Sequence, residues 1–541
     1  MSSVIQPLAS AAADVGTVPC MAVNSPVTAL GRFRSILYPD QRPISLPSSP
    51  PPCFKDLNLD QIVDAITADR VFYDLKPFFY SHLDDLDTIR YRQEVMADLQ
   101  VPELRAAVEA FAAGMHRVRK CLQPEEKLYY QRQKERSFLE ATRLYCDVLA
   151  QLSASLAVRP VASQGFLAFR SYLSDYLTSE PFVVLQRDVH HLLDALGAAT
   201  YSMLITDNRV KVQKYVPTDD ISIAIDRTFA KFRQGEVRDY RAKFNEWPGM
   251  NHVEAAVLDM VAKLYPETFA EQSDFCARHT DFLDPIIRDF DREVQFYLAY
   301  LAYIEPLLDA GVDFCFPTVW ADSKAVFAHD TFDLALASQL VRTTNTLSVV
   351  CNDFELSGRE RILVVSGPNQ GGKTTFARLF GQLHHLACIG CLVPGSRAEL
   401  FLFDRLFTLF EKQERPGDLR GKLQDDLIRA RDILNHASGR SLILINEIFS
   451  STTASDAAFL GQKILQRIID LDALCVCVTF IHELTQMGAS IVSMMSCVDP
   501  EDPSRRTFQV VRKPADRLSY AISIARKHRL TYDSVKERMR P

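Results

Sequence analysis

Apolar residues recur at three- and four-residue spacing through most of the chain between residues 54 and 345. The spacing is clearest over residues 101–122, 125–156 and 251–308, where charged residues fill the positions between. One face of an α-helix repeats with this period, so the pattern predicts long amphipathic helices. No repeat of fixed length accompanies them, which disfavours a helical solenoid.

Residues 201–215 break this helical pattern. An apolar run at 203–205 leads to the turn pair Asp207-Asn208, after which Val210 and Val212 alternate with polar residues. Alternation with a period of two on both sides of a short polar turn is typical of a β-hairpin. We therefore expect one short hairpin near residues 201–215 inside an otherwise helical region.

The last third of the chain has a different pattern. A short apolar run at residues 361–366 leads into a glycine-rich loop, and a helical pattern follows at 376–386. Strand, glycine loop and helix in this order predict a phosphate-binding loop, in which backbone amides and a helix N-terminus converge on phosphate oxygens. The candidate ligand-binding residues of this loop are Gly367, Pro368, Asn369, Gln370, Gly371, Gly372, Lys373, Thr374 and Thr375.

Two residues of the loop carry the chemistry expected of a nucleotide site. Lys373 is placed to neutralise the β and γ phosphates of ATP, and Thr374 to offer its hydroxyl to Mg²⁺, which prefers oxygen ligands. A second apolar run at 441–445 ends in Asn446-Glu447, where a nucleotide hydrolase needs acidic groups near the metal. Glu447 is the candidate base that orients or deprotonates water. Asn446 is the weaker candidate, since its uncharged amide contacts Mg²⁺ only through a bound water.

Length and composition limit the possible classes of protein. A chain of 541 residues exceeds the usual single domain, so several units are expected. Its 61 basic and 68 acidic residues exclude a histone-like cation but leave DNA binding open, since that depends on where basic residues cluster. No apolar run reaches the roughly 18–20 residues of a membrane span. We therefore expect a cytoplasmic protein without a membrane-spanning segment. Targeting to an organelle is left open.

Composition also divides the chain into three parts. Residues 1–53 are rich in proline and serine towards their end and predict a tail of little order. Residues 54–345 carry the helical pattern, and residues 346–541 carry the glycine loop and its neighbouring strands.

Several segments resemble one family. The run GPNQGGKTT at 367–375 resembles the phosphate-binding loop of the MutS mismatch-repair ATPases, in which Pro-Asn follows the first glycine. Residues 387–394, 403–408 and 519–525 are similar to later MutS segments, and residues 86–94 are similar to the start of the MutS core domain. The resemblance implies a multidomain fold: an all-α core and lever region at 54–345, followed by an α/β P-loop NTPase of the ABC type at 346–541 that ends in a dimerisation segment.

The departures from the family pattern concern hydrolysis. Asn446 stands where the family has aspartate, residues 421–423 lack the hydroxyl of its signature segment, and Phe480 stands where it has a histidine. The resemblance still makes Asp456 and His482 candidate nucleotide-binding residues, and Lys422 a substitute for the missing signature hydroxyl. Val349 offers no ring where the family often stacks one on adenine. We therefore expect a protein that binds ATP and Mg²⁺ and hydrolyses ATP slowly.

The resemblance implies a homodimer whose ATP sites are completed by the partner subunit, and a clamp for structured or mismatched DNA. Only about 53 residues stand where mismatch-reading and connector domains precede the family's core, so we expect no mismatch reading of that kind. The basic candidates for DNA contact are Arg117, Arg119, Lys120, residues 127–136, Arg209, Lys211, Lys214 and residues 505–540. For any single cluster a solvated helix face is the simpler explanation, and residues 505–540 are alternatively a solvated helix end or a segment that pairs with acids of the partner. The alternative function is a hydrolysis-poor ATP-binding scaffold or switch that acts through protein partners, with a repair protein as one candidate.

Overall fold

The computed structural model describes residues 33–39, 46–122, 130–206, 209–216, 228–229, 250–344, 348–411, 421–499, 502, 505–515 and 530–538. Predictions for residues 1–32, for the hairpin turn at 207–208, for the segment 519–525 and for the basic run 526–529 lie outside these residues. So do parts of the basic stretches 127–136 and 505–540.

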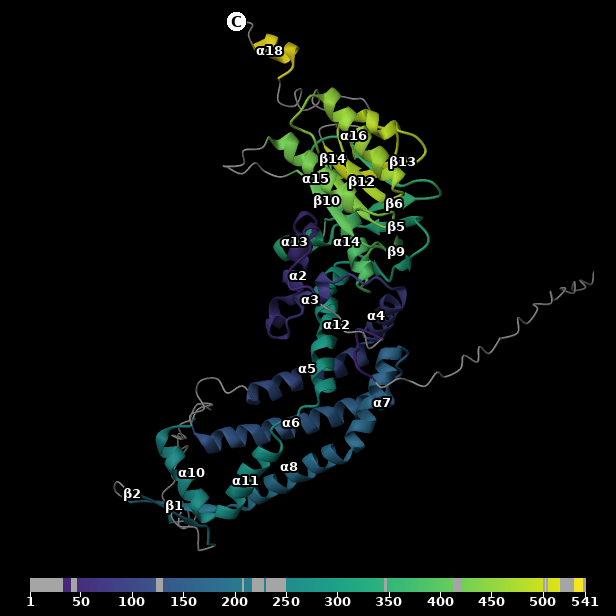
Figure 1. The fold of residues 1–541 in the computed structure, drawn as a ribbon. Coiled ribbons are helices and arrows are strands. Elements are labelled where there is room, and N and C mark those ends of the chain that lie inside the picture. Colours follow the sequence, from purple (N-terminus) through teal and green to yellow (C-terminus); the bar gives the residue numbers. More distant parts are fainter. Residues whose placement is uncertain are drawn as a thin grey trace, which may run out of the picture.

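The molecule is elongated, with a helical part at one end and an α/β part at the other (Figure 1). A long helix, α12, runs from the helical part towards the α/β part (Figure 1). The helices up to this point are α1 (Cys53–Asp56), α2 (Leu59–Thr67), η1 (Ala68–Tyr73), α3 (Lys76–Tyr80), α4 (Leu86–Asp98), α5 (Pro102–Leu122), α6 (Gln131–Val158), α7 (Gln164–Thr178), α8 (Glu180–Ala198), α10 (His252–Leu264), α11 (Pro266–Arg278) and α12 (Pro285–Asp309).

Local sequence signals explain where several of these helices begin. The Asp284 carboxylate accepts a hydrogen bond from the backbone N–H of Ile287 (3.0 Å), and Pro285 occupies the first turn of α12. Asn251 and Glu254 form a reciprocal capping box at the start of α10. Each cap satisfies backbone N–H groups that the helix itself leaves unpaired. The boundaries of the long helices are therefore fixed by residues next to the apolar pattern.

The elements after α12 belong mostly to the α/β part. They are β3 (Phe314–Cys315), β4 (Thr318–Trp320), β5 (Val326–Thr331), α13 (Leu334–Thr344), β6 (Asn352–Leu356), β7 (Ile362–Ser366), α14 (Lys373–Cys388), β8 (Val393–Pro394), β9 (Arg397–Phe401), β10 (Leu406–Phe410), α15 (Lys422–His436), β11 (Leu442–Asn446), α16 (Ala454–Asp470), β12 (Leu474–Val478), η2 (His482–Gln486), β13 (Ile491–Val498), β14 (Arg506–Arg512) and α18 (Tyr532–Arg538).

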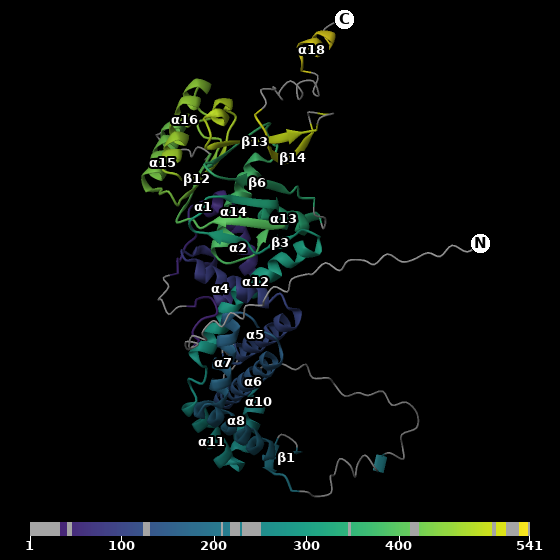
Figure 2. The ribbon, with the colours of Figure 1, turned by 90° about the vertical axis from the view of Figure 1, so that its right-hand side faces the viewer.

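The main sheet has six strands in the order β10-β11-β12-β7-β13-β14, parallel except for the last pair. Alternate residues of β7 face opposite sides: Leu363 and Val365 join the apolar cluster of α14, and Ile362 and Val364 join that of α15 and α16. Figure 2 shows α14 on one side of this sheet and α15 and α16 on the other. A parallel strand covered on both faces needs an uninterrupted apolar run, which is what residues 362–365 supply.

A second sheet, in the order β4-β9-β5-β6, combines strands from both sides of residue 345. β4 pairs with β9 and β5 pairs with both β6 and β9, so residues 318–331 pack with the α/β part. Farther from this sheet, β1 (Tyr201–Thr206) and β2 (Arg209–Lys214) form an antiparallel pair at the position where the sequence predicts a hairpin. The chain is thus helix-rich, with mixed sheets and more than one unit.

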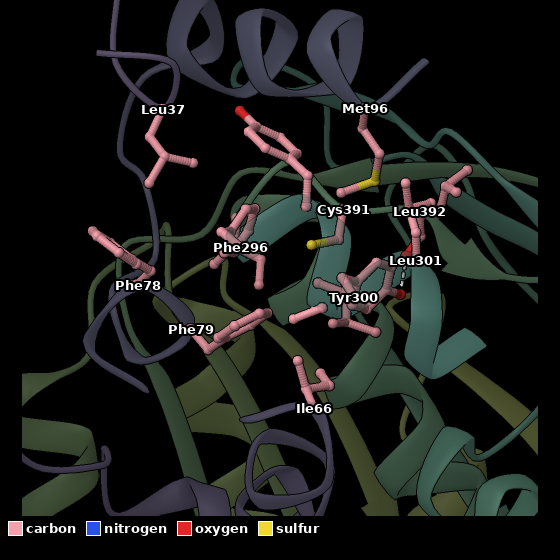
Figure 3. Packing of buried hydrophobic residues seen from close by; sticks show 14 of the residues in the cluster. Leu37, Ile66, Phe78, Phe79, Met96, Phe296, Tyr300, Leu301, Cys391 and Leu392 are labelled. Atoms are coloured by element: carbon pink, nitrogen blue, oxygen red, sulfur yellow. Dashed lines mark hydrogen bonds between the residues drawn. The ribbon is translucent and has the colours of Figure 1, made fainter. Parts of the chain in front are cut away.

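The prediction of a tail of little order is wrong for residues 33–38. Ile36 and Leu37 are completely buried, and the Phe33 ring packs edge-to-face against the Phe169 ring. Leu37 lies in the same packed cluster as Phe78 and Phe296 (Figure 3). Three buried apolar side chains within five residues stabilise this segment, although prolines and serines elsewhere in 1–53 suggested a tether.

The backbone of this segment is also held by side chains from distant helices. The hydroxyls of Tyr91 and Tyr297 donate to the carbonyl oxygens of Ser35 and Ile36 (2.8 Å each). The Arg92 guanidinium donates to Leu37 O (3.1 Å) and also to Ile389 O (3.1 Å) of the α/β part. Residues 33–38 thus form a strap, and we call them the strap below, that lies where α4 and α12 meet the α/β part.

Within the described ranges, no helix combines the length and apolar character needed to cross a membrane.

Candidate functional site

The glycine loop lies between β7 and α14, at the carboxyl end of a strand near the middle of the main sheet. The strand, loop and helix follow the order that the sequence predicts. In parallel α/β sheets this edge is where ligands bind, because loops there are free to diverge while the strands fix their ends. The N-terminus of α14 points its unpaired backbone N–H groups into the same region.

Backbone conformation at two positions and close packing at a third explain the glycines of the loop. Gly367 and Gly372 have φ of +125° and +90°, in the region that side chains rarely adopt. A Cβ on Gly371 would lie 2.3 Å from Ser496 Oγ, which donates a hydrogen bond to Gly371 O (2.6 Å). The loop is therefore pressed against β13, and its curvature depends on the missing side chains.

Lys373 begins α14 and is 3% exposed. Its ammonium donates to Gly367 O (3.1 Å) and Pro368 O (3.0 Å) and lies 3.7 Å from Glu447 Oε1. Burial lowers the pKa of Lys373, while the Glu447 carboxylate acts in the opposite direction. The lysine thus sits under the loop with its charge directed at the loop's own carbonyls.

Thr374, in the first turn of α14, meets Asn446 at the end of β11. The Thr374 hydroxyl donates to Asn446 Oδ1 (2.9 Å), and Asn446 is the last residue of β11. Glu447 follows with φ of +53°, its N–H bonded to Val478 O (3.0 Å) at the end of β12. This left-handed turn re-aims the Glu447 side chain towards Lys373. The structure therefore brings together the loop, Lys373, Thr374, Asn446 and Glu447.

Two of the predicted site residues have other partners. Asp456 accepts a hydrogen bond from Thr453 Oγ1 (2.8 Å) and its N–H donates back to that oxygen (3.2 Å), so the pair caps α16. His482 opens η2, where its Nε2 faces the Gln486 amide (3.1 Å). Its backbone carbonyl accepts from Thr485 Oγ1 (2.7 Å). The contacts of both residues are thus local to their own elements.

Three contacts at the loop go beyond the predicted set. Arg506, on β14, donates from Nε to Asn369 O (3.1 Å), which ties the edge strand to the loop. Phe508, on the same strand, has φ of +60°, and its backbone lies next to Gly372. The Phe480 ring lies 4.1 Å from Lys373 Nζ. The basic stretch after 505 was a sequence signal for Arg506, but only the pairing of β13 with β14 places it at the loop.

The Lys422 side chain binds partners within its own subunit. It begins α15 and forms an ion pair with Glu411, and its ammonium also donates to Ser450 Oγ (3.0 Å). The Lys422 ammonium lowers the pKa of the Glu411 carboxyl. This contact ties the start of α15 to the loop that follows β11.

The oxygen donors at Thr374, Asn446 and Glu447 are of the type that Mg²⁺ takes, but only one of the three is charged. Among the residues that the structure describes, no group of three or more His, Cys, Asp or Glu side chains is arranged to hold a metal ion alone. A hydroxyl, an amide and one carboxylate suit a hydrated ion brought by a phosphate ligand better than a metal held by the protein only.

Comparison with known proteins finds similarity to one family. A family model described as MutS domain V matches residues 363–539, from within β7 to the last helix. Residues 363–539 are therefore similar to domain V of the MutS family. Proteins named DNA mismatch repair protein MutS are also similar: that of Shouchella clausii is 32% identical over 183 residues, and that of Geobacillus kaustophilus 33% identical over 181.

The similarity to these MutS proteins covers only part of each chain. The aligned residues make up 33% and 32% of this chain but only 21% and 20% of those two relatives. The MutS protein of Geobacillus thermodenitrificans gives the same picture, with 32% identity over 181 residues. The chain therefore spans about a fifth of the length of these MutS relatives.

Proposed function

We propose that this chain is an ATP-binding protein of the DNA mismatch repair class, in which ATP binding and slow hydrolysis control a dimeric DNA clamp. The observation that carries the proposal is the loop of residues 367–372, with Lys373 buried beneath it and Thr374 bonded to Asn446. The similarity of residues 363–539 to MutS domain V supports ATP as the ligand, because that domain is an ATPase domain in the MutS family.

Each residue has a separate task in this proposal. The loop amides and the N-terminus of α14 bind the phosphates, and Lys373 offsets their charge. Mg²⁺, when bound with ATP, supplies further positive charge at the phosphates; Thr374 would hold it through the hydroxyl and Asn446 through a bound water. Glu447 accepts a proton from the attacking water or orients it. Asp456 and His482 remain proposed nucleotide contacts, which require both side chains to leave their local partners.

Asn446 is the reason to expect slow hydrolysis. An amide cannot offer the negative charge of a carboxylate, and loss of one charge-stabilising contact in a transition-state site costs roughly 2–4 kcal/mol. Asn446→Asp should therefore raise the steady-state rate of ATP hydrolysis, while Asn446→Ala should not. Wild-type hydrolysis as fast as that of Asn446→Asp would contradict the proposed role of this position.

The DNA clamp is proposed from the helical part, which we infer to correspond to the family's all-α core and lever region. Arg117 and Lys120 are exposed on α5, and Arg209 and Lys211 are exposed on the hairpin. Arg119 is the weakest of the predicted contacts, since it forms an ion pair with the buried Asp291. Exposed cations can bind phosphates without reading sequence.

A salt-dependent shift assay with duplex, mismatched and four-way junction DNA tests the clamp, with and without ATP. Arg209 and Lys211 should be changed together to Gln, and the matched control changes Arg187 and Arg288, exposed cations that pair with neighbouring acids. The hairpin variant should bind less and show a shallower dependence on salt. Absence of binding at low salt would favour the second candidate, an ATP-binding switch that acts through protein partners. The Lys422–Glu411–Ser450 contact supports that candidate, because it engages Lys422, the substitute for the missing signature hydroxyl, within its own subunit.

A further inference from the structure

Phe480 is an exposed aromatic residue that covers a buried lysine. It follows β12 and precedes η2, and 54% of it is exposed to solvent. Its ring centre lies 4.1 Å from the ammonium of Lys373, which is itself 3% exposed. A cation this close to an aromatic face is attracted by the ring's electron distribution. The ring thus lies directly against the loop lysine.

The Lys373 ammonium has four contacts in this arrangement: two hydrogen bonds, one ion pair and one aromatic ring. An ammonium carries three N–H groups, and two of them are directed to Gly367 O (3.1 Å) and Pro368 O (3.0 Å). The third direction faces Glu447 Oε1 at 3.7 Å and the Phe480 ring. A phosphate oxygen that binds Lys373 must therefore replace one of these partners.

Phe480 is a partner that can leave Lys373 without a shift of the backbone. Its neighbours are anchored: Thr479 N–H donates to Val365 O (3.0 Å) on β7, and Ile481 N–H donates to Thr479 Oγ1 (3.0 Å). The loop carbonyls belong to a backbone fixed against Ser496. The exposed ring, by contrast, leaves Lys373 by a change of its own side-chain torsions, without a shift of β7 or β12.

We propose that Phe480 is a lid on Lys373 in the nucleotide-free chain, and that the ring and a nucleotide phosphate compete for the same ammonium. This rests on the proposed ATP site. A phosphate makes a charge-assisted hydrogen bond that the ring cannot match, so nucleotide displaces the lid. The lid lowers the affinity for nucleotide by the strength of its contact, about 2- to 30-fold for interactions of this kind.

The first test needs no nucleotide. The full chain is treated with an amine-acylating reagent at fixed pH, and the rate of Lys373 modification is followed by peptide mass spectrometry. Phe480→Ala should raise this rate by about 2- to 30-fold, and Phe480→Tyr, which keeps the ring, should not. The matched control is Phe459→Ala, because Phe459 is 60% exposed and has Lys463 over its ring at 5.7 Å. Equal rates in wild type and Phe480→Ala would overturn the lid.

The second test is the affinity of the same variants for ATP with Mg²⁺. Phe480→Ala should bind more tightly by the factor seen in labelling, and Phe480→Tyr and Phe459→Ala should bind as wild type does. Faster labelling with unchanged or weaker affinity would overturn the competition. Faster labelling with no ATP binding by any variant would instead refute the proposed function and leave the contact between Phe480 and Lys373 standing. ATP binding without a change in either measurement would refute the lid alone.

Discussion

Glu293, on α12, is the carboxyl group that holds the strap. Its Oε2 accepts hydrogen bonds from Ser35 Oγ (2.8 Å) and from the backbone N–H of Ile36 (2.9 Å). Burial raises the pKa of Glu293 from 4.5 to about 7, although both hydrogen bonds act to lower it. The strap therefore depends on a carboxyl group that titrates near neutral pH.

The raised pKa sets the direction of the pH dependence. Below pH 4.5 Glu293 is protonated in both the folded and the unfolded chain, and its pKa shift costs no stability. As the pH rises from 4.5 to about 7, the unfolded chain loses the proton first, so the folded chain is destabilised relative to it. One pKa unit corresponds to about 1.4 kcal/mol, so the free energy of unfolding falls by at most about 3 kcal/mol over this range.

Glu293→Gln removes this titration and keeps an oxygen that accepts from Ser35 and Ile36. We expect the variant to be more stable than wild type at pH 8, by up to about 3 kcal/mol, and to approach wild type at pH 5. Burial raises the pKa of Asp291 to about 6. Asp291 is present in both proteins, so its contribution to the pH dependence of stability cancels in the comparison. Urea unfolding of both chains at each pH measures the difference. Asp309→Asn, an exposed change at the end of α12, is the control.

Two results would refute this reasoning. An equal stability difference between Glu293→Gln and wild type at pH 5 and pH 8 would mean that Glu293 does not titrate in this range. A variant less stable at pH 8 than at pH 5, relative to wild type, would mean that the ionised carboxylate stabilises the strap.

The remaining predictions concern the strap and the loop. Leu37→Ala should lower the free energy of unfolding by about 2–5 kcal/mol, because Leu37 is completely buried; a loss below about 1 kcal/mol in urea unfolding would mean that the strap is not packed as described. Gly367→Ala should cost roughly 1–3 kcal/mol and abolish ATP binding, since φ is +125° and its Cβ would lie 2.8 Å from Ser496 O. Gly421→Ala, with φ of −66° and open space around it, is the matched control for stability and for binding of fluorescent ATP; equal effects of the two changes would contradict the strain argument.

The strand, loop and helix of the candidate site could be predicted because their signals are local. Residues 362–366 form a buried strand because every position is apolar or small, and Gly372 precedes α14 because its left-handed conformation suits glycine. The strand that ends in Asn446 could likewise be predicted from its four apolar residues. The cap formed by Thr453 and Asp456 was present in the sequence as a threonine three residues before an aspartate, and this spacing explains the local role of Asp456.

The strap and the lid could not be predicted in this way. Phe33, Ile36 and Leu37 look like isolated apolar residues in a tail, and their burial depends on Tyr91, Arg92 and Tyr297, which are distant in sequence. The contact of Phe480 with Lys373 exists only because β12 lies beside β7. The sheet that joins β4 and β5 with β6 and β9 likewise depends on pairing across residue 345. Such features arise from topology, which local pattern does not specify.

Calorimetric titration of the full chain with ATP and Mg²⁺ tests the central proposal most directly. We predict binding of about one ATP per wild-type chain, and binding about 10- to 150-fold weaker by Lys373→Ala, since a charge-assisted contact is lost. The control is Lys463→Ala, which removes an exposed lysine on α16 and should leave the titration unchanged. Absence of binding to the wild-type chain, or equal binding by wild type and Lys373→Ala, would contradict the account.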